Sequence, residues 1–465
     1  MTIKINVNSL SQEHFKSRRE ISEKLAHFDP DHPGYHHVRF SLNSFKIKNR
    51  PHHFDKSVEH LCIVYHVLRE PIDECMKSWK NGRFDGARLR ILLPSLLKGL
   101  DYMHTCGVVH TDIKADNIMM GLGSEDVLEK FVEEVAKNPP ACKKVAHDKY
   151  IYESRSYFGG APSDEVIKSA KITDIGLADW GNKLNNRPIQ SNAFTAPEVI
   201  LTAGWSYPAD IWNLGVMLWD IIGEDGLFDC ISTEPGKYHS DQHLGAMINL
   251  LGQPPEELLE RGSTSATYFD GTEFRKPKLI NAKCTWESQL KKNLKGEERQ
   301  LFIDFAQKMI RWLPEDRWTA KQLLDHPFLT KTEFKTWADP ESESGVNFIE
   351  QFAKTKIRSN TITPLPTPSP PGGLSPAGPS PVGTPAPSIK GLARASTAGS
   401  VATVASNASL NVTSAPLMRS SSNVSAHGKC TNDVSQSLID NILNGSKRKS
   451  GTSTPVIVEE PFEPK

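Results

Sequence analysis

The side chains best suited to chemistry lie together in one short stretch, residues 110–117 (HTDIKADN). Asp112 can accept the proton of a hydroxyl group, Lys114 can neutralise a phosphoryl group in transfer, and Asn117 can coordinate a metal ion. Further along, Asp174 opens the triplet DIG after a β-like run (AKIT). It adds a hard oxygen ligand suited to Mg²⁺, and the glycine permits a sharp turn. These residue types in this order indicate phosphoryl transfer assisted by a divalent cation.

Strands and helices of several kinds must position those side chains. Residues 36–48 and 60–68 are rich in β-branched and aromatic residues and predict strands. Residues 88–105, directly before the polar stretch, place Leu and Met on one helical stripe. Residues 208–222 are apolar nearly all round, as a buried central helix would be. Further helices are expected over residues 243–251, 254–261, 298–312 and 319–324. A few strands followed by a helical body is an α+β pattern, which we expect to form two lobes.

Three later motifs complete an ordered series. They are APE, which ends at Glu198, then YPADIW with Asp210, and PEDRWTA with Arg317. With these motifs, the chain from about residue 2 to 330 resembles a eukaryotic protein kinase. HTDIKADN resembles the catalytic loop, DIG the metal-binding triplet and APE the end of the activation segment. The resemblance implies that Asp210 anchors the backbone of the catalytic loop. It also implies a buried ion pair between Glu198 and Arg317.

The same resemblance implies a bilobal protein-kinase fold of the α+β class. Residues 1–68 would form a truncated, β-rich small lobe, and residues 69–336 a mainly helical large lobe with an insertion at about 121–169. Residues 337–465 would be a low-complexity, mostly disordered tail, since Ser, Thr, Pro, Gly and Ala dominate there. This tail carries Thr-Pro and Ser-Pro pairs. They are either sites for proline-directed kinases or parts of an unselected linker.

A finer resemblance is to the SR-protein kinases, in particular their fungal branch. It is carried by HTD in the loop, by the insertion of about 55 residues before Asp174, and by WSYPADIWNLGVMLWD. It implies a Ser/Thr kinase that uses ATP and Mg²⁺ and acts on Arg-Ser-rich splicing factors. Lys114 favours Ser/Thr over Tyr as the acceptor, and Thr195 would buttress Asp112 and Lys114.

The N-terminal stretch carries the expected phosphate contacts. Lys4 resembles the strand lysine that holds the α- and β-phosphates, and Glu20 its helical partner. Tyr65 would lie at the back of the adenine pocket, and the backbone from His66 to Leu68 would form the hinge. No Gly-rich loop precedes Lys4 in this sequence. Either the true start lies upstream, or the chain lacks the loop and binds ATP poorly.

Three functions therefore stay open at this point. The first is an active Ser/Thr protein kinase, and the second is a catalytically weak or silent pseudokinase that acts as an interaction scaffold. The third is a small-molecule phosphotransferase, against which stand Lys114, the APE triplet and Arg317. Thr111 replaces the loop arginine that a phosphorylated activation segment neutralises in many kinases, and residues 180–198 offer only Ser191 and Thr195 as hydroxyls. We therefore expect activity that does not depend on phosphorylation of this segment.

The composition of the chain limits which partners and which cell compartment are expected. The 55 Lys and Arg balance 55 Asp and Glu, which gives no reason to expect direct nucleic-acid binding. The sequence has no run of about 18 apolar residues that would cross a membrane. The 7 Cys contain no CxxC pair and fit reduced thiols. We expect a monomer in the cytoplasm, the nucleus or both.

Overall fold

The computed structural model describes residues 1–6, 12–48, 59–79, 82–124, 126–146, 149–153, 158, 160–223, 225–229, 231, 238–280, 285–287, 290 and 294–335. The predicted tail at 337–465, with its Ser-Pro and Thr-Pro pairs, lies outside these residues.

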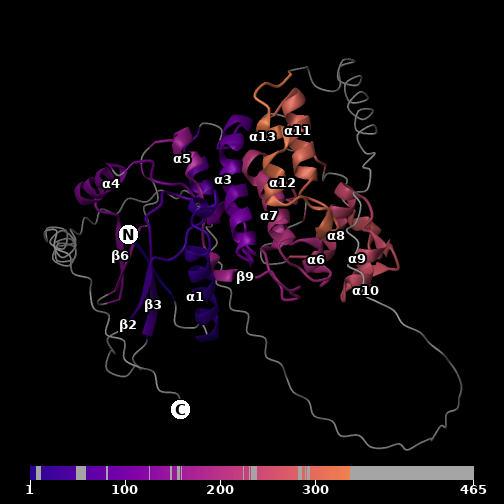
Figure 1. Cartoon of the computed structure of the whole chain (residues 1–465), viewed down its shortest axis with the longest axis horizontal. Helices are drawn as coiled ribbons and strands as arrows, with labels where there is room; N and C mark the ends of the chain where they lie inside the picture. Colours follow the sequence, from indigo (N-terminus) through magenta and orange to yellow (C-terminus); the bar gives the residue numbers. More distant parts are fainter. Residues whose placement is uncertain are drawn as a thin grey trace, which may run out of the picture. The chain divides into compact units, whose positions relative to one another are not determined.

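A three-stranded antiparallel sheet forms the N-terminal part of the fold (Figure 1). Its strands follow the order β1 (Thr2–Ile5), β3 (Glu59–Tyr65) and β2 (Asn43–Lys48). Helix α1 (Gln12–His27) lies next in sequence to β1, and Leu25 on its last turns is fully buried. The Tyr102 hydroxyl donates to the Leu25 carbonyl at 2.6 Å, which ties the end of α1 to the helical body.

The predicted strand at 36–48 begins later than expected. Residues Tyr35–His37 form a 3₁₀ turn, η1, and β2 starts only at Asn43. The reason is a close backbone approach, since a Cβ on Gly34 would lie 1.8 Å from the carbonyl oxygen of Lys98. The backbone before β2 therefore lies against the helical body, where Val38 is buried and bridges Ile172.

The helical body is organised around two long helices that the sequence predicted. Helix α3 (Gly86–Thr105) starts at Asp85, whose side chain accepts a hydrogen bond from the Arg88 amide at 2.8 Å, and buries its whole Leu and Met stripe. Helix α7 (Pro208–Ile222) is buried along nearly its full length. In Figure 1 α7 lies beside α3 and α11, and the Trp219 ring meets Phe302 of α11 at 5.2 Å.

Helices form at the four further predicted positions, with shifted ends, and several short helices that the sequence did not predict join them. Helix α11 stops at Gln307 rather than 312, because the Lys308 carbonyl accepts the Trp318 amide and turns the chain. These elements are α2 (Ile72–Met76), α6 (Pro197–Ile200), α8 (Ser240–Leu251), α9 (Glu256–Arg261), α10 (Ser265–Tyr268), β10 (Phe269–Asp270), β11 (Glu273–Phe274), α11 (Gly296–Gln307), α12 (Ala320–Leu324) and α13 (Pro327–Thr330). Among the helices described, none is both long enough and apolar enough to cross a membrane.

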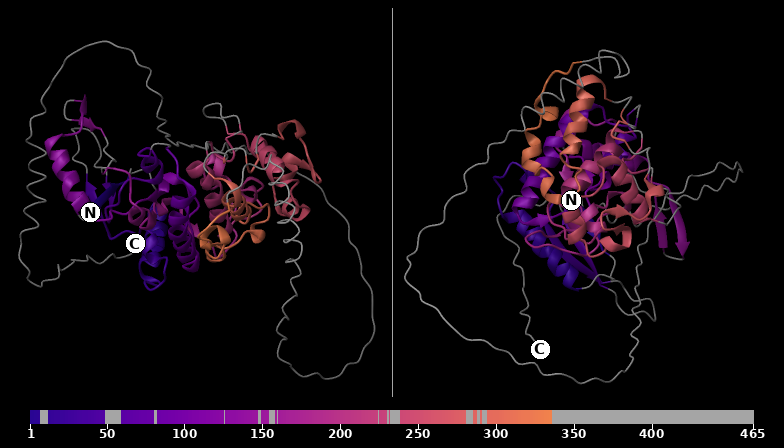
Figure 2. Two further views of the ribbon diagram at one scale, coloured as in Figure 1. Left: turned by 90° about the horizontal axis from the view of Figure 1, so that it is seen from above. Right: turned by 90° about the vertical axis from the view of Figure 1, so that its right-hand side faces the viewer.

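The insertion at 121–169 has an outer and an inner part. Its outer part is α4 (Asp126–Lys137) and the hairpin of β6 (Cys142–Ala146) and β7 (Lys149–Tyr152), which projects from the body in Figure 2. Its inner part is α5 (Asp164–Lys168), which packs against α3 and is fixed by a 2.7 Å hydrogen bond from Ser95 to the Lys168 carbonyl. The inner part therefore braces α3.

Two short ladders bring the polar loops at 110–117 and 173–178 together. Strand β4 (Val108–Val109) pairs with β9 (Asp179–Trp180), and β5 (Ile118–Met119) pairs with β8 (Lys171–Ile172). The loop at 110–117 joins β4 to β5, and the loop at 173–178 joins β8 to β9. The two polar loops therefore leave the same pair of ladders side by side.

Candidate functional site

The loop at 110–117 folds so that its three predicted chemical groups converge. The Asn117 amide nitrogen donates to the Asp112 carbonyl at 2.8 Å and to Asp112 Oδ2 at 3.1 Å. Lys114 Nζ lies 3.1 Å from the same carboxylate oxygen. Asp112 is partly exposed, so a hydroxyl can reach it, while Asn117 is buried. A proton acceptor, a cation and an amide oxygen are thus held in one place.

The backbone of this loop is strained and is held by Asp210. Thr111 has φ 72°, a left-handed conformation that is costly for a β-branched residue. The fully buried Asp210 accepts the amides of His110 and Thr111, both at 2.8 Å. The Thr111 hydroxyl also donates to the Leu177 carbonyl at 2.9 Å. The resemblance predicted that Asp210 anchors the loop, and these contacts are that anchor.

The His110 ring links the two polar loops. Its Nε2 must donate to the Thr173 carbonyl at 2.8 Å, since a carbonyl can only accept. Its Nδ1 then accepts the Asp112 amide at 3.3 Å. The Thr173 amide and hydroxyl donate to the Asn117 carbonyl at 2.8 and 3.0 Å. Asp174, the next residue, is thereby set beside Asn117.

Asp174 is the second predicted metal ligand and has φ 57°, also in the left-handed region. Burial would raise the pKa of its carboxyl, but the nearby Lys4 outweighs this and holds that pKa below its usual value. Lys4 Nζ lies 2.8 Å from Asp174 Oδ1. The carboxylate of Asp174 and the side-chain amide of Asn117, on two adjoining loops, are a donor set that fits Mg²⁺, which takes one or two such ligands together with phosphates.

The structure does not bring Lys4 and Glu20 together. The Glu20 side chain is exposed and makes no hydrogen bond or ion pair with any residue of the described chain, while Lys4 pairs with Asp174 instead. The reason is the rotation of α1. At about 100° per residue, Glu20 and Arg18 lie on opposite sides of the helix, and Arg18 is the one that faces the Asp174 turn.

The predicted hinge follows β3 directly. Arg39 covers it, stacking on the Tyr65 ring at 4.5 Å and donating from Nη2 to the His66 carbonyl at 2.8 Å. That carbonyl keeps a second lone pair with which to accept from a ligand. Leu68 is buried at the inner end of the hinge. The sequence did not predict a role for Arg39, and the one feature that could have indicated it is a cation within an otherwise apolar run.

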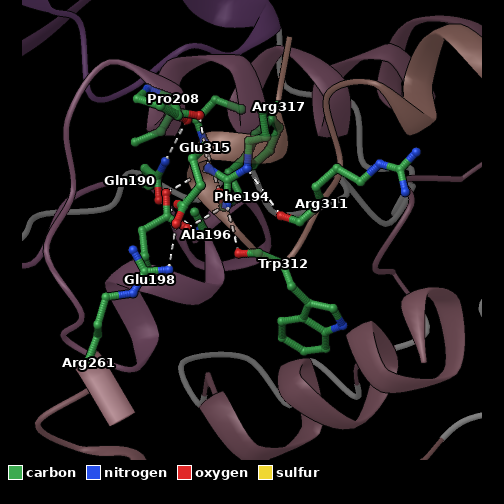
Figure 3. A network of polar contacts seen from close by, with 12 residues as sticks. Gln190, Phe194, Ala196, Glu198, Pro208, Arg261, Arg311, Trp312, Glu315 and Arg317 are labelled. Carbon is green, nitrogen blue, oxygen red and sulfur yellow. Dashed lines mark hydrogen bonds and ion pairs between the residues drawn. The ribbon is translucent and has the colours of Figure 1, made fainter. Parts of the chain in front are cut away.

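A buried ion pair fixes the end of the activation segment, as predicted (Figure 3). Arg317 donates from Nη1 and Nη2 to the two carboxylate oxygens of Glu198 at 2.7 and 2.6 Å. It also donates to the carbonyls of Pro208 at 2.9 Å and Arg311 at 3.1 Å. All the donors of this guanidinium are directed inward, so the pair is a structural anchor rather than a reactive site.

Within the activation segment, Thr195 does not contact the catalytic residues. Its hydroxyl donates to the Asn192 carbonyl at 2.9 Å, because it ends the 3₁₀ turn Asn192–Phe194 and finds a local partner there. The predicted support of Asp112 and Lys114 by Thr195 is therefore absent from the described contacts.

Gln190 is a further residue that sequence reasoning missed. It has φ 71°, and its amide accepts from the Ala196 backbone at 2.8 Å and donates to the Ala209 carbonyl at 3.0 Å. This one side chain therefore clamps the activation segment onto the start of α7 (Figure 3).

Comparisons with known proteins show which family the chain belongs to. A model of the protein kinase domain matches residues 161–329, and one of protein tyrosine and serine/threonine kinases matches residues 59–231. A serine/threonine protein kinase of Aspergillus fumigatus is 31% identical over 312 residues, which span 67% of this chain and 73% of that protein. The serine/threonine-protein kinase SRPK of Physarum polycephalum is 27% identical over 287 residues, which span 58% of this chain and 67% of that one. A crystal structure of a kinase domain is 20% identical, with a TM-score of 0.49, over 70% of this chain and 86% of that one.

Proposed function

The chain belongs to the protein kinase family and is a serine/threonine protein kinase, and from this premise we propose that it uses ATP and Mg²⁺ to phosphorylate Arg-Ser-rich proteins. Members of this family act on protein substrates and use a magnesium-bound nucleotide.

The observation that carries the assignment of roles is the convergence of Lys114 and Asn117 on the Asp112 carboxylate, each at 3.1 Å. Asp112 accepts the hydrogen bond of the substrate hydroxyl and orients its oxygen for attack. Lys114 neutralises charge that develops on the transferred group. Asn117 and Asp174 would hold Mg²⁺, which supplies charge neutralisation on the phosphates when bound. Lys4, now paired with Asp174, lies where it can contact a phosphate oxygen as well.

A single substitution tests the role of Asp112. We expect Asp112→Ala to lower phosphate transfer to a Ser peptide by about 10²–10⁴-fold, the usual contribution of a positioned proton acceptor. The melting temperature should change little, since Asp112 is partly exposed. Asp325→Ala is the matched control, because Asp325 is an exposed carboxylate at the end of α12. Equal activity of the two variants would contradict the assignment.

Clustered carboxylates support a basic substrate. Asp116, exposed in the catalytic loop, acts electrostatically on both Asp73 and Asp220. Burial and the nearby Asp229 raise the pKa of Asp220 to about 7, against the opposing effect of Arg83. Of the three carboxylates Asp116 is the exposed one, and it could attract an arginine of a bound peptide.

A second acidic surface lies on the α9–β10 region. A cavity of about 270 Å³ is bordered there by Glu256, Glu260 and Asp270. Arg275 borders it too, but it faces Asp270 at 3.8 Å and donates to the Phe269 carbonyl. Glu256 and Glu260 have no ion-pair partner among the described residues. These two carboxylates are therefore free to bind arginine side chains of a substrate.

Peptide kinetics test the substrate class. We expect the KM of an Arg-Ser repeat peptide to be at least tenfold lower than that of the same peptide with Gln in place of Arg. Glu256→Gln combined with Glu260→Gln should raise the KM of the Arg-Ser peptide and leave the Gln-Ser peptide unchanged. Glu165→Gln, an exposed carboxylate on α5, is the control. Indistinguishable KM values for the two peptides would refute the substrate proposal and leave the kinase assignment intact.

A further inference from the structure

The Arg39 side chain contacts three sides of the space where the base of a nucleotide is expected to bind. Its guanidinium carbon lies 4.5 Å from the centre of the Tyr65 ring, the predicted back of the adenine pocket. Its Nη2 donates to the His66 carbonyl in the hinge at 2.8 Å. Its Nη1 lies 3.7 Å from Met119 Sδ on β5. The guanidinium therefore bridges the back of the pocket, the hinge and β5.

The contact with the hinge is one that a nucleotide base also needs. The predicted hinge binds a base through backbone N–H and C=O groups alone, and the amino group of adenine is a donor that requires a carbonyl. The His66 carbonyl retains a second lone pair, but its first donor belongs to a planar group that already covers the Tyr65 ring. A base cannot lie against the same face of that ring while the guanidinium is there. Arg39 and the base are therefore alternatives at this place.

The described contacts of the Arg39 guanidinium are weak ones for a partly buried cation. Its Nε is buried and has no hydrogen-bond partner, and Arg39 forms no ion pair with any residue that the structure describes. Burial lowers the pKa of the guanidinium, against smaller opposing effects of Tyr65 and Asp174. Bonds to a neutral carbonyl and a thioether are weaker than the paired bonds that a carboxylate would form. A ligand can therefore displace this side chain at small cost.

The backbone of Arg39 is fixed although its guanidinium is loosely held. The Arg39 amide donates to the Ile172 carbonyl at 2.8 Å, and the preceding Val38 is buried and bridges Ile172. The flexible stem of an arginine can change rotamer without a change in this backbone. Movement of the guanidinium away from the hinge is therefore a side-chain step that leaves the fold in place.

We propose that Arg39 determines the affinity of the nucleotide site, because its guanidinium competes with the base for the hinge and must turn away when a nucleotide binds. This inference rests on the proposed use of ATP and deepens it, since it makes a cation of the chain itself a competitor of the base. The apparent affinity is then the intrinsic affinity reduced by the fraction of molecules in which Arg39 has left the hinge. Removal of the guanidinium should therefore strengthen binding, whereas removal of a residue that supports the hinge would weaken it.

Adenosine is the probe, because it carries the base without phosphates. It is titrated calorimetrically into the full chain without Mg²⁺. Arg39→Met keeps an unbranched stem beside Tyr65 and removes every donor, so it should bind adenosine about fivefold more tightly than the wild type. Arg39→Lys, which keeps the charge and loses the planar fork, should lie between the two. Arg311→Met is the matched control and should bind as the wild type does, since the Arg311 side chain is exposed on the helical body.

Chemical modification of the wild type tests the same movement without a substitution. Phenylglyoxal reacts with accessible guanidinium groups, and mass spectrometry locates the modified arginine. Saturating adenosine should increase the rate of modification at Arg39 and leave the rate at Arg311 unchanged. Weaker or equal adenosine binding by Arg39→Met, or slower or unchanged modification of Arg39 with adenosine bound, overturns the proposal. Either outcome leaves the kinase assignment intact, because the Asp112→Ala test measures phosphate transfer and not the binding of adenosine.

Discussion

Replacement of Glu198 by Gln tests whether the buried ion pair with Arg317 anchors the activation segment. The two side chains are 1% and 0% exposed, and both carboxylate oxygens accept from the guanidinium. Glu198→Gln keeps the shape but leaves the charge of Arg317 without its counter-ion. Breaking a buried pair in this way costs about 3–5 kcal/mol of unfolding free energy.

The chain offers a matched control in the same network (Figure 3). Arg261 and Glu315 also form an ion pair, at 2.9 Å, but their side chains are 42% and 50% exposed. Solvent screens such a pair, so the chemically identical change Glu315→Gln should cost only about 0–1 kcal/mol. The contrast between the two variants isolates burial from the loss of one carboxylate.

Urea unfolding followed by tryptophan fluorescence measures both variants. Trp212 is a suitable reporter, because the Arg317 guanidinium lies 5.1 Å from its ring. The double variant Glu198→Met with Arg317→Met should be more stable than Glu198→Gln, since no buried charge is left unpaired. A cost of less than about 1 kcal/mol for Glu198→Gln would refute the reasoning, because it would make the buried pair equivalent to an exposed one.

Three further predictions concern groups near the site. The carboxyl of Asp220 has a raised pKa of about 7 in the folded protein, so the unfolding free energy falls as the pH rises from about 4 to 7. Asp220→Asn should flatten this fall. An unchanged pH profile in urea titrations would count against the prediction. Phosphatase treatment, and the variant Ser191→Ala, should leave peptide phosphorylation within about twofold of the untreated protein, while loss of activity mapped to Ser191 or Thr195 by mass spectrometry would contradict this. Gln190→Ala should lower kcat about tenfold and the unfolding free energy by about 1 kcal/mol, as measured by steady-state kinetics and urea unfolding, because it removes two hydrogen bonds that hold the segment; an unchanged kcat would refute its positioning role.

The part of the site that could be predicted from the residues themselves is the one fixed by short-range spacing. Asp112, Lys114 and Asn117 lie within one tight loop, so their convergence follows from the chain itself. The contacts of Asp210 with that loop, and the pair of Glu198 and Arg317, span about 100 residues or more, and only the resemblance to a known family predicted them.

The parts of the fold and of the site that could not be predicted depend on contacts that no local sequence pattern specifies. Residues 16–20 of α1 (KSRRE) carry charge on every side, so no apolar stripe there decides whether Glu20 or Arg18 meets the sheet. The late start of β2 depends on Gly34, whose close approach to the Lys98 carbonyl is a tertiary contact that no local pattern encodes. The Thr195 hydroxyl donates to the carbonyls of Asn192 and Ser191, and no pattern in the sequence distinguishes these local partners from distant ones.

The backbone strain explains why the buried polar contacts belong to function as well as to stability. Thr111 and Asp174 both have positive φ, which costs about 1–3 kcal/mol for each residue. That is a substantial part of the 5–15 kcal/mol by which typical folded domains are stable. A relaxed loop would rotate Asp112 away from Lys114, and a relaxed turn would move Asp174 away from Asn117. The two amide bonds to the buried Asp210 oppose the first relaxation, and the ion pair with Lys4 opposes the second. The geometry of these two loops therefore exists against the preference of its own backbone, and Asp210, which lies outside the proposed reacting groups, helps to maintain it.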